Sequence, residues 1–442
     1  MRAIPSLCLA LTLGCATSPI DRAWLARRIA ERTGHPTRSA LQGPPQAGLP
    51  PGTSLDDGIT EDEAVAIALW NHPGFQSDLS QLGFARADLA DAGMLPNPIL
   101  ALLLPLGPRQ VEGWLSWPIE VLWQRPRRVE AARLEVARVG ESLVQTGLDV
   151  ARDARLAHVE LALARARADI RAELAATFDA LATLAERRAD AGDLGDAEVA
   201  AVRVDAGIAR EQRARATMDL ALANARMLQA IGHAERQGAL VATPPEGLPP
   251  APPETDVLTR TALAARPDVR AAELALEAAG ARRGWEVSRI FGLVARVDGF
   301  SPAPDGAAPT RVTGRAGLQM TLPIFQQNQG GIGRADAEIE RATWRYAQTR
   351  QQVVTDVVAA RAQLAQALAA IGPWRATVLP AAEEAVRGAT RAFALGDASY
   401  VAVLDATRRL LDARLREAEL VADARRADAQ LDRSLGGRHA PR

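Results

Sequence analysis

An internal repeat restricts the fold of this chain more than any other feature of its sequence. Short groups of residues recur in the same order in both halves. The four pairs are Asn71-His72-Pro73-Gly74 with Ala265-Arg266-Pro267-Asp268, Trp117-Pro118-Ile119 with Leu322-Pro323-Ile324, Gly192-Asp193 with Gly396-Asp397, and Ala230-Ile231-Gly232 with Ser434-Leu435-Gly436. The offset grows from 194 to 205 between the first two pairs, which predicts an insertion near residues 301–310. The repeat predicts two copies of one structural plan.

The repeat and its flanks divide the chain into six predicted parts. Pro-rich segments that cannot be helical separate the repeats from each other and from the N-terminal region. The parts are a signal peptide (1–14), an N-terminal extension (15–58), a first repeat (59–242), a proline-rich connector (243–254), a second repeat (255–437) and a tail (438–442).

Each repeat predicts the same order of elements. A helical segment comes first, at about 60–94 and 255–289, and two short strands follow it. The strands are expected at 97–104 and 111–122 in the first repeat, and at 292–300 and 313–324 in the second. A long helix (127–189 or 330–394), a glycine-containing tip and another helix (196–232 or 398–436) complete each repeat. Pro373 and Pro380 should break or kink the second long helix.

The strands of the second repeat alternate between polar and apolar residues. Arg315, Gly317, Gln319 and Thr321 share one face, and Ala316, Leu318, Met320 and Leu322 share the other. Arg296 and Asp298 alternate with Ala295 and Val297 in the same way. This alternation is typical of a barrel wall between lipid and a wet lumen, although a half-buried strand of a soluble sheet gives it too. Trp114, Trp117 and Trp123 are expected either at a membrane interface or in a core.

The first long helix carries coiled-coil spacing. The repeating apolar residues are Leu156, Val159, Leu163, Ala166 and Ile170, with Leu174, Phe178 and Leu181 after a shift. A helix over 127–189 would span on the order of 90 Å, which suits a tunnel better than a compact domain. His158, next to Val159, is expected on the helix surface.

The N-terminus predicts export. Arg2, an apolar run from Ile4 to Leu13 and then Cys15 are typical of a bacterial lipoprotein signal, with lipidation at Cys15. An ordinary signal peptide with an incidental cysteine is the alternative, because Thr12 stands where leucine is usual. No later stretch reaches the roughly 18 uncharged residues of a membrane-spanning helix, so strands are expected to make any further insertion.

Several other functions find no support in the sequence. A net charge of −1 without a basic cluster argues against a nucleic-acid partner. The five histidines are scattered without ligand spacing, and no phosphate-binding loop or nucleophile elbow occurs. We therefore expect no enzyme activity, no cofactor and no metal site.

Together these motifs resemble the TolC-like outer-membrane efflux proteins, over nearly all of Ile59 to Gly437. The similar residues of the first half are Ile59 to Ala64, His72-Pro73, Ala92 to Pro98 and Trp117 to Glu120. Those of the second half are Ala265 to Ala272, Leu322 to Phe325, Phe393 to Ser399 and Val403 to Ala406. The lipidation signal and Leu95-Pro96-Asn97-Pro98 are most similar to the branch that serves pumps of the resistance-nodulation-division type.

The resemblance implies a mainly α-helical homotrimer in the outer membrane of a Gram-negative bacterium. Each chain would give four strands to one twelve-strand barrel, and the helices would form a periplasmic tube. The helical tips, Arg188 to Leu194 with Gly192 and Phe393 to Ser399 with Gly396, would meet a periplasmic adaptor protein that connects to an inner-membrane pump. Asp405 matches an acidic gate position of the family, but Ala402 stands where a second acidic residue is usual, so Asp405 is either a gate or a solvated helix residue.

Two functions of different classes follow. The first is a passive duct that conducts small molecules or cations for the pump. The second is a lipid-anchored coiled-coil protein of the envelope without a pore. Two pairs of alternating strands between helices favour the duct, since a scaffold has no use for them. The sequence does not identify the cargo, which could be a metal cation, a drug or a secreted peptide.

Overall fold

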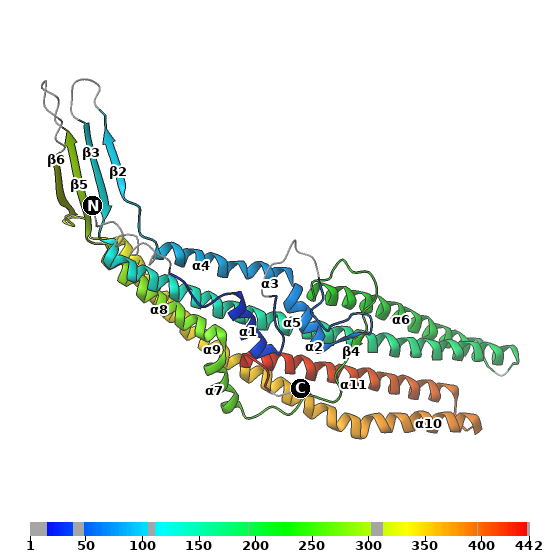
Figure 1. Ribbon diagram of the computed structural model, residues 1–442. Helices are drawn as coiled ribbons and strands as arrows, with labels where there is room; N and C mark the ends of the chain where they lie inside the picture. Colours follow the sequence, from blue (N-terminus) through cyan, green and yellow to red (C-terminus); the bar gives the residue numbers. More distant parts are fainter. Residues whose placement is uncertain are drawn as a thin grey trace. The chain divides into compact units, whose positions relative to one another are not determined.

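A computed structural model describes residues 16–38, 48–104, 111–192, 194–301, 313–395 and 397–439 (Figure 1). The predicted signal peptide, Cys15 and Gly396 lie outside the described residues. The described chain is mostly helical and forms two compact units. The sheet unit comprises described residues of Met1–Leu25, Asp78–Leu143 and Pro267–Arg350, and the hairpin unit those of Ala26–Ser77, Val144–Arg266 and Gln351–Arg442.

The elements follow the predicted order. The first half contains α1 (Arg22–Thr33), β1 (Ile59–Thr60), α2 (Glu61–Asn71), α3 (Pro73–Asp78), α4 (Ser80–Gly93), β2 (Ile99–Leu103), β3 (Val111–Pro118), α5 (Val121–Asp190) and α6 (Asp196–Ala230). The second half contains β4 (Ala242–Thr243), α7 (Thr255–Ala265), α8 (Pro267–Ser288), β5 (Gly292–Ser301), β6 (Thr313–Thr321), α9 (Gln329–Pro373), the π-helical turn η2 (Trp374–Val378), α10 (Leu379–Leu395) and α11 (Tyr400–Leu435).

Local sequence explains several of these boundaries. Thr60 caps α2, because its hydroxyl accepts the Glu63 N–H at 3.2 Å while the Glu63 carboxylate accepts the Thr60 N–H at 2.9 Å. Pro73 and Pro267 begin new helices, since a proline disfavours helical geometry at the residue before it. Pro373 is the last residue of α9, and the π-helical turn η2 leads from it directly into α10, so the hydrogen-bond pattern changes there while the helical segment continues. Pro380 lies in the first turn of α10 and does not end the helix, contrary to the prediction.

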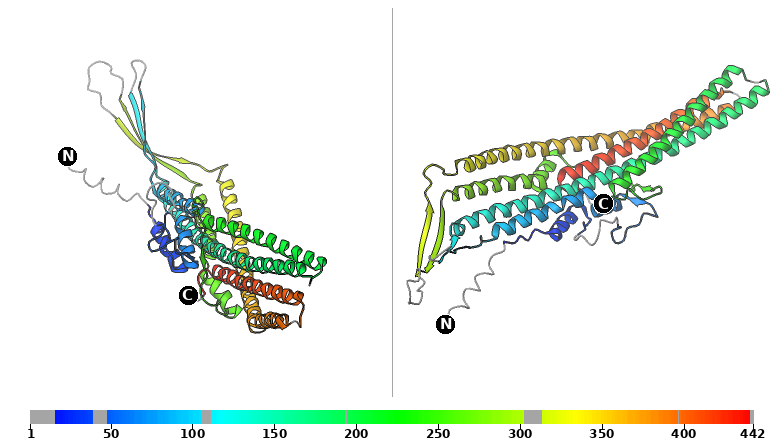
Figure 2. Two further views of the ribbon diagram at one scale, coloured as in Figure 1. Left: turned by 90° about the vertical axis from the view of Figure 1, so that its right-hand side faces the viewer. Right: turned by 90° about the horizontal axis from the view of Figure 1, so that it is seen from above.

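Four antiparallel strands form one sheet in the order β2-β3-β5-β6 (Figure 1). Four helices of the sheet unit lie side by side in the order α4-α5-α8-α9 (Figure 2, right). Arg128 of α5 donates to the Ala92 carbonyl of α4 at 2.9 Å, and Arg127 of α5 donates to the Gly284 carbonyl of α8 at 2.7 Å. Tyr346 of α9 donates to Glu273 of α8 at 3.2 Å. Consequently α4 and α9 are the outermost helices of this row.

The hairpin unit packs α6, α5, α11 and α10 in a second row. The predicted coiled-coil residues Leu174 and Phe178 of α5 are buried with Val202 and Ala206 of α6 and Leu411 of α11. Further along α5, Val159 and Leu163 are buried against Ala422 of α11. The predicted apolar seam of this helix therefore faces its neighbours.

One helical segment, Gln329–Phe393, contains an 18-residue window with a mean hydropathy of 1.2, so by length and composition it could cross a membrane. This differs from the expectation that, after the signal peptide, only strands could insert into a membrane. Asp356 within the segment is ion-paired with both Arg266 and Arg433 at 3.0 Å, and Val353 and Val357 are fully buried. We therefore interpret the segment as part of the helix packing. Only 28% of the window is buried in the single chain, which leaves apolar surface uncovered.

Candidate functional site

The strand register gives β3, β5 and β6 one apolar and one polar face, whereas β2 is apolar on both faces, because Ile99, Ala101 and Leu103 are aligned with the polar rows. Leu100, Leu115, Val297 and Ala316 are aligned across the four strands, and Trp117, Ala295 and Leu318 are aligned across three. The polar face carries Ser116, Arg296 and Gly317 in one row and Trp114, Asp298 and Arg315 in the next. The predicted faces of β5 and β6 are thus on the same two sides of one sheet.

The apolar face is exposed to the surroundings of the chain. Leu100 is 65% exposed, Val297 52% and Leu318 69%. A half-buried strand of a soluble sheet would cover this face with other parts of the fold, and no described residue does so here. Exposure of aligned large apolar side chains is what a lipid-facing strand requires.

The polar face has charges that are neutralised within the sheet. Arg296 lies 4.7 Å from the centre of the Trp114 ring and pairs with Asp298. Arg296 and Asp298 are each 39% exposed, so both remain in contact with solvent. Such a face suits the wall of a water-filled lumen. Glu112 and Arg315 line the same concave surface.

Two of the predicted tryptophans lie near the end of β3 that leads into α5, with Trp117 on β3 and Trp123 on α5, whereas Trp114 lies in the middle of the sheet opposite Ala101 and Asp298. The Trp117 indole donates to the Pro96 carbonyl at 2.9 Å, and the Trp123 indole donates to the Ser288 carbonyl at 3.3 Å. Trp123 is 39% exposed, and Trp114 and Trp117 are partly exposed. For Trp117 and Trp123, an apolar ring with a bonded N–H and partial exposure fits a membrane interface better than a core, whereas Trp114 belongs to the polar face.

The first predicted tip lies in the turn between α5 and α6. Gly192 has a φ of +83°, a conformation that favours glycine, and no atom lies within 4 Å of a Cβ placed there. Leu194 packs against the buried cluster of α5, α6 and α11. The contact of Leu194 with this cluster therefore helps to fix the conformation of the turn.

A cation–π contact connects the two predicted tips. The Arg188 guanidinium of α5 lies 5.0 Å from the centre of the Phe393 ring of α10. Ser399 is the N-cap residue of α11, and Gly396 lies outside the described residues. The structure thus brings the ends of α5 and α10 together, so that the two predicted tips can form a single docking surface.

The predicted gate residue Asp405 lies on α11 with its side chain 52% exposed. Its carboxylate pairs with Arg409, one turn along the same helix, at 2.8 Å. Nearby, Arg408 pairs with Asp205 of α6 at 3.0 Å. The negative charge of Asp405 is therefore partly neutralised by Arg409. A single chain is consistent with both interpretations of Asp405, as a gate residue and as a solvated helix residue.

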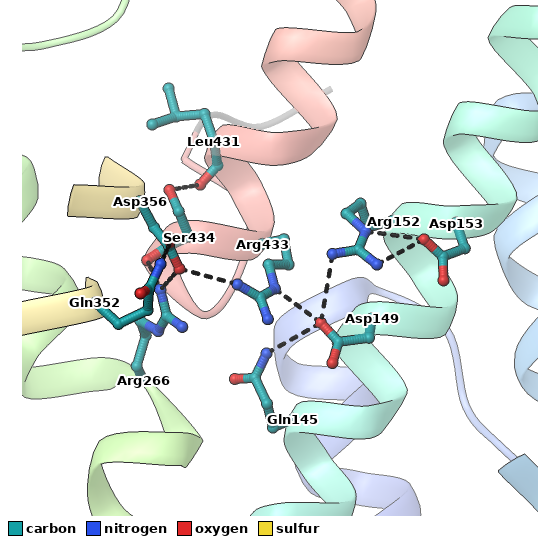
Figure 3. Close-up of polar contacts among 10 residues, drawn as sticks. All are labelled: Gln145, Asp149, Arg152, Asp153, Arg266, Gln352, Asp356, Leu431, Arg433 and Ser434. Carbon is teal, nitrogen blue, oxygen red and sulfur yellow. Dashed lines mark hydrogen bonds and ion pairs between the residues drawn. The ribbon is translucent and has the colours of Figure 1, made fainter. Parts of the chain in front are cut away.

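Sequence reasoning missed a chain of paired charges in the hairpin unit, of which Arg266 is buried and the others are partly exposed (Figure 3). Arg266 pairs with Asp356 at 3.0 Å, Asp356 pairs with Arg433 at 3.0 Å, and Arg433 pairs with Asp149 at 2.7 Å. Arg266 is only 2% exposed. The network ties α5, α9 and α11 to the end of α7. The motif Ala265-Arg266-Pro267-Asp268 was the one signal for it in the sequence.

The expectation that His158 lies on the helix surface was wrong. It is 1% exposed, and its Nε2 lies 2.9 Å from the carbonyl of Ile59. Burial lowers the pKa of His158, so the neutral ring donates to this carbonyl. Beside it, Arg155 pairs with Asp432 at 2.6 Å and with Glu61 at 3.4 Å. Burial alone would raise the pKa of Asp432, but the hydrogen bond from His439 and the charge of Arg155 outweigh it and lower that pKa.

Residues 258–437 match the family described as outer membrane efflux protein. The chain is 28% identical over 386 residues to the cobalt-zinc-cadmium resistance protein CzcC of Cupriavidus metallidurans, covering 86% of this chain and 90% of CzcC. The fold is similar to the outer membrane protein VceC of Vibrio cholerae, with a TM-score of 0.70, 18% identity and coverage of 86% and 97%. The CmeC outer membrane channel of Campylobacter jejuni gives a TM-score of 0.72, 15% identity and 86% coverage of both chains.

Proposed function

The chain belongs with the TolC-like outer-membrane efflux proteins, and from this premise we propose that it is the outer-membrane channel component of a tripartite efflux pump. It conducts cargo passively from an inner-membrane pump and a periplasmic adaptor to the outside. The two-faced sheet is the observation that carries the proposal, because an exposed apolar face and a solvated polar face are the requirements of a channel wall.

The channel is a homotrimer in this proposal. Four strands are too few to close a barrel around an open pore, whereas three chains supply twelve. Backbone groups at an open sheet edge would be unsatisfied in hydrocarbon, which costs several kcal/mol for each group. The mostly exposed apolar window of Gln329–Phe393 supports association as well.

The partners follow from the two ends of the molecule. The tip surface formed by Arg188, Leu194 and Phe393 docks the periplasmic adaptor, and the pump behind it is of the resistance-nodulation-division type. Lipid attached to Cys15 adds an anchor in the outer membrane. Divalent metal cations are the first cargo to test, because the relative CzcC is named for resistance to cobalt, zinc and cadmium.

Conductance of the purified protein in a planar bilayer, measured together with its mass in detergent, tests this function. We expect a trimer with discrete conductance steps. Two neighbouring residues of β6 provide a matched pair of variants. Leu318→Arg places a charge on the apolar face and should reduce membrane insertion at a cost of about 2–4 kcal/mol per site, whereas Gln319→Arg on the polar face should insert normally and change only the conductance.

The competing function predicts different results. A folded monomer or rod without conductance, with equal behaviour of both β6 variants, would favour the lipid-anchored coiled-coil scaffold. Equal loss of insertion in both variants would instead contradict the assignment of the two sheet faces.

A further inference from the structure

The helices and strands of the sheet unit are joined at one end of the sheet. The connections precede β2 and β5 and follow β3 and β6, and successive strands are antiparallel, so all four meet at the same end (Figure 1). Each connection, or the helical turn next to it, exposes large apolar side chains. These residues form what we call the collar, and they are Met94, Leu95, Leu122, Phe291, Ile324 and Phe325.

The collar continues the apolar face of the sheet toward the helices. Leu293 and Met320 are aligned across β5 and β6 on that face. Phe291 precedes Leu293 by two residues, and the exposed Leu322 follows Met320 by two, so the apolar alternation extends past the last hydrogen bonds of the sheet. A lipid-facing surface that extends this far brings the first turns of the helices to the level of the lipid headgroups.

Two arginines of α5 lie next to the collar. Arg127 and Arg128 follow Leu122 by five and six residues, and no acidic residue occurs between Val121 and Glu130. This end of α5 is the positive end of the helix dipole, so arginines here do not stabilise the helix. Their position is therefore better explained by something that they bind.

Backbone carbonyls hold both guanidinium groups in place without cancelling their charge. Arg127 donates to the Gly284 carbonyl of α8 at 2.7 Å, and Arg128 donates to the Met94 carbonyl of the collar at 2.8 Å. Within the described ranges neither forms an ion pair, although Asp88 and Asp91 line the same hollow as Arg128. Since a guanidinium has five N–H donors, each arginine keeps donors for an anion.

The combination of an apolar collar and fixed guanidinium groups matches a phospholipid better than other partners. Arginine recognises a phosphate through its planar fork, and the collar offers a surface to acyl chains. Free phosphate would not use the collar, and a second copy of the chain would not use the charges. Four arginines and two glutamates occur in residues 119–128 and 286–291, so the charge around the collar favours anionic lipids.

We propose that the collar, Arg127 and Arg128 bind anionic phospholipid in the periplasmic leaflet of the outer membrane. The lipid phosphate lies on the two guanidinium groups, and its acyl chains lie against Leu122 and Phe291. The inference rests on the proposed channel function and adds a lipid site to it. Bound lipid fixes the depth of the channel in the membrane, because its headgroup and chains are held on adjacent surfaces.

Lipid retention, measured by native mass spectrometry, tests the site. The wild-type protein is reconstituted in nanodiscs of equal parts phosphatidylglycerol and phosphatidylcholine and released into mild detergent. We expect at least fivefold more phosphatidylglycerol than phosphatidylcholine on the protein. Arg127→Gln with Arg128→Gln should abolish this preference, whereas Arg133→Gln should keep it, because Arg133 is an exposed arginine of the same helix farther from the collar. Displacement of the lipid by excess inorganic phosphate would identify a site for free phosphate and overturn the proposal.

Photo-crosslinking in the same nanodiscs gives a second measurement that leaves both arginines intact. Benzoylphenylalanine in place of Phe291 should form an adduct with the mass of one phospholipid. The same group in place of Phe84, an exposed aromatic residue of α4 outside the collar, should not. An interchain product at position 291 would overturn the lipid site and identify the collar as a contact between copies.

The failure of this site and the failure of the proposed function give different results. A wild-type protein that inserts and conducts but retains both lipids equally would overturn the lipid site alone. A wild-type protein that neither inserts nor conducts would overturn the proposed function itself.

Discussion

The backbone of Asn71 lies directly against Gly232. A Cβ on Gly232 would be 2.8 Å from the carbonyl carbon and oxygen of Asn71, and Gly232 has a φ of +72°. The second half has a similar contact, since a Cβ on Gly436, with a φ of +78°, would be 3.3 Å from the Ala265 carbonyl oxygen. In each half, the end of the helix before a proline therefore packs against the left-handed glycine that ends the last helix.

Replacement of Gly232 should destabilise the hairpin unit. Gly232→Ala combines an unfavourable left-handed conformation with a clash against backbone that cannot move away, and we expect a loss of about 2–4 kcal/mol. Thermal unfolding followed by circular dichroism measures it. Gly207→Ala in α6 is the control, because a Cβ there meets nothing within 4 Å and alanine should stabilise the helix by up to about 1 kcal/mol. Equal stability of the two variants would contradict this explanation.

The pair Arg266 and Asp356 provides a test of the charge network at its buried end (Figure 3). Arg266→Met removes a partner of Asp356 inside the fold and should cost about 3–5 kcal/mol. Arg266→Met with Asp356→Leu should cost less than the sum of the single variants, since no unpaired charge remains at this contact. Unfolding of all three variants measures the coupling. Strictly additive losses would show that the two side chains act independently.

The sequence predicted local elements well because their causes are local. The alternation of β5 and β6 and the apolar seam of α5 both depend on residues close together in the chain. The burial of His158 was missed because Ile59, whose carbonyl accepts a hydrogen bond from its ring, is distant in the sequence. The ion pair of Arg155 with Asp432 was missed for the same reason, since each residue alone matches a solvated helix surface.

The features of the candidate site also differ in how well the sequence predicts them, and local features are again predicted best. Sequence pattern identified both faces of the second strand pair, but only the pairing of β3 with β5 shows that both halves share one sheet. Gly192 was assigned from its residue type, and its positive φ agrees with that assignment. The gate role of Asp405 stays a prediction, because a gate is formed by several copies around an axis, which neither the sequence nor one chain contains.

Stability should decrease as the pH falls below about 7 because of His158. Burial lowers the pKa of this ring in the folded protein, so the unfolded chain binds more protons below its ordinary pKa of about 6.5, and protonation favours unfolding. His158→Gln should reduce the slope of stability against pH between 5.5 and 7.5. A residual slope is expected from His233, whose pKa burial also lowers. An unchanged slope in the variant lacking both histidines would contradict this origin.

The tip surface should determine adaptor binding. Arg188→Glu and Leu194→Glu place negative charge beside Phe393 and on the apolar contact of the turn, and we expect at least tenfold weaker binding of the cognate adaptor. Surface plasmon resonance with purified adaptor measures the affinity. Arg165→Glu serves as the control, because it is an exposed arginine of the same helix far from the tip. Equal affinity for all three variants would exclude this surface as the docking site.

Asp405 and Arg409 should affect ion selectivity in opposite directions. If three Asp405 carboxylates narrow the channel around its axis, Asp405→Ala should lower the ratio of cation to anion permeability, because the attractive charge is lost. Arg409→Ala should raise the ratio, since it removes the cation that neutralises Asp405 at 2.8 Å. Reversal potentials in a salt gradient measure both. Asp412→Ala on the same helix is the control, as its carboxylate faces Arg171 at 3.9 Å. A ratio that changes equally in the Asp405 and Asp412 variants, or in neither, would identify Asp405 as a solvated helix residue.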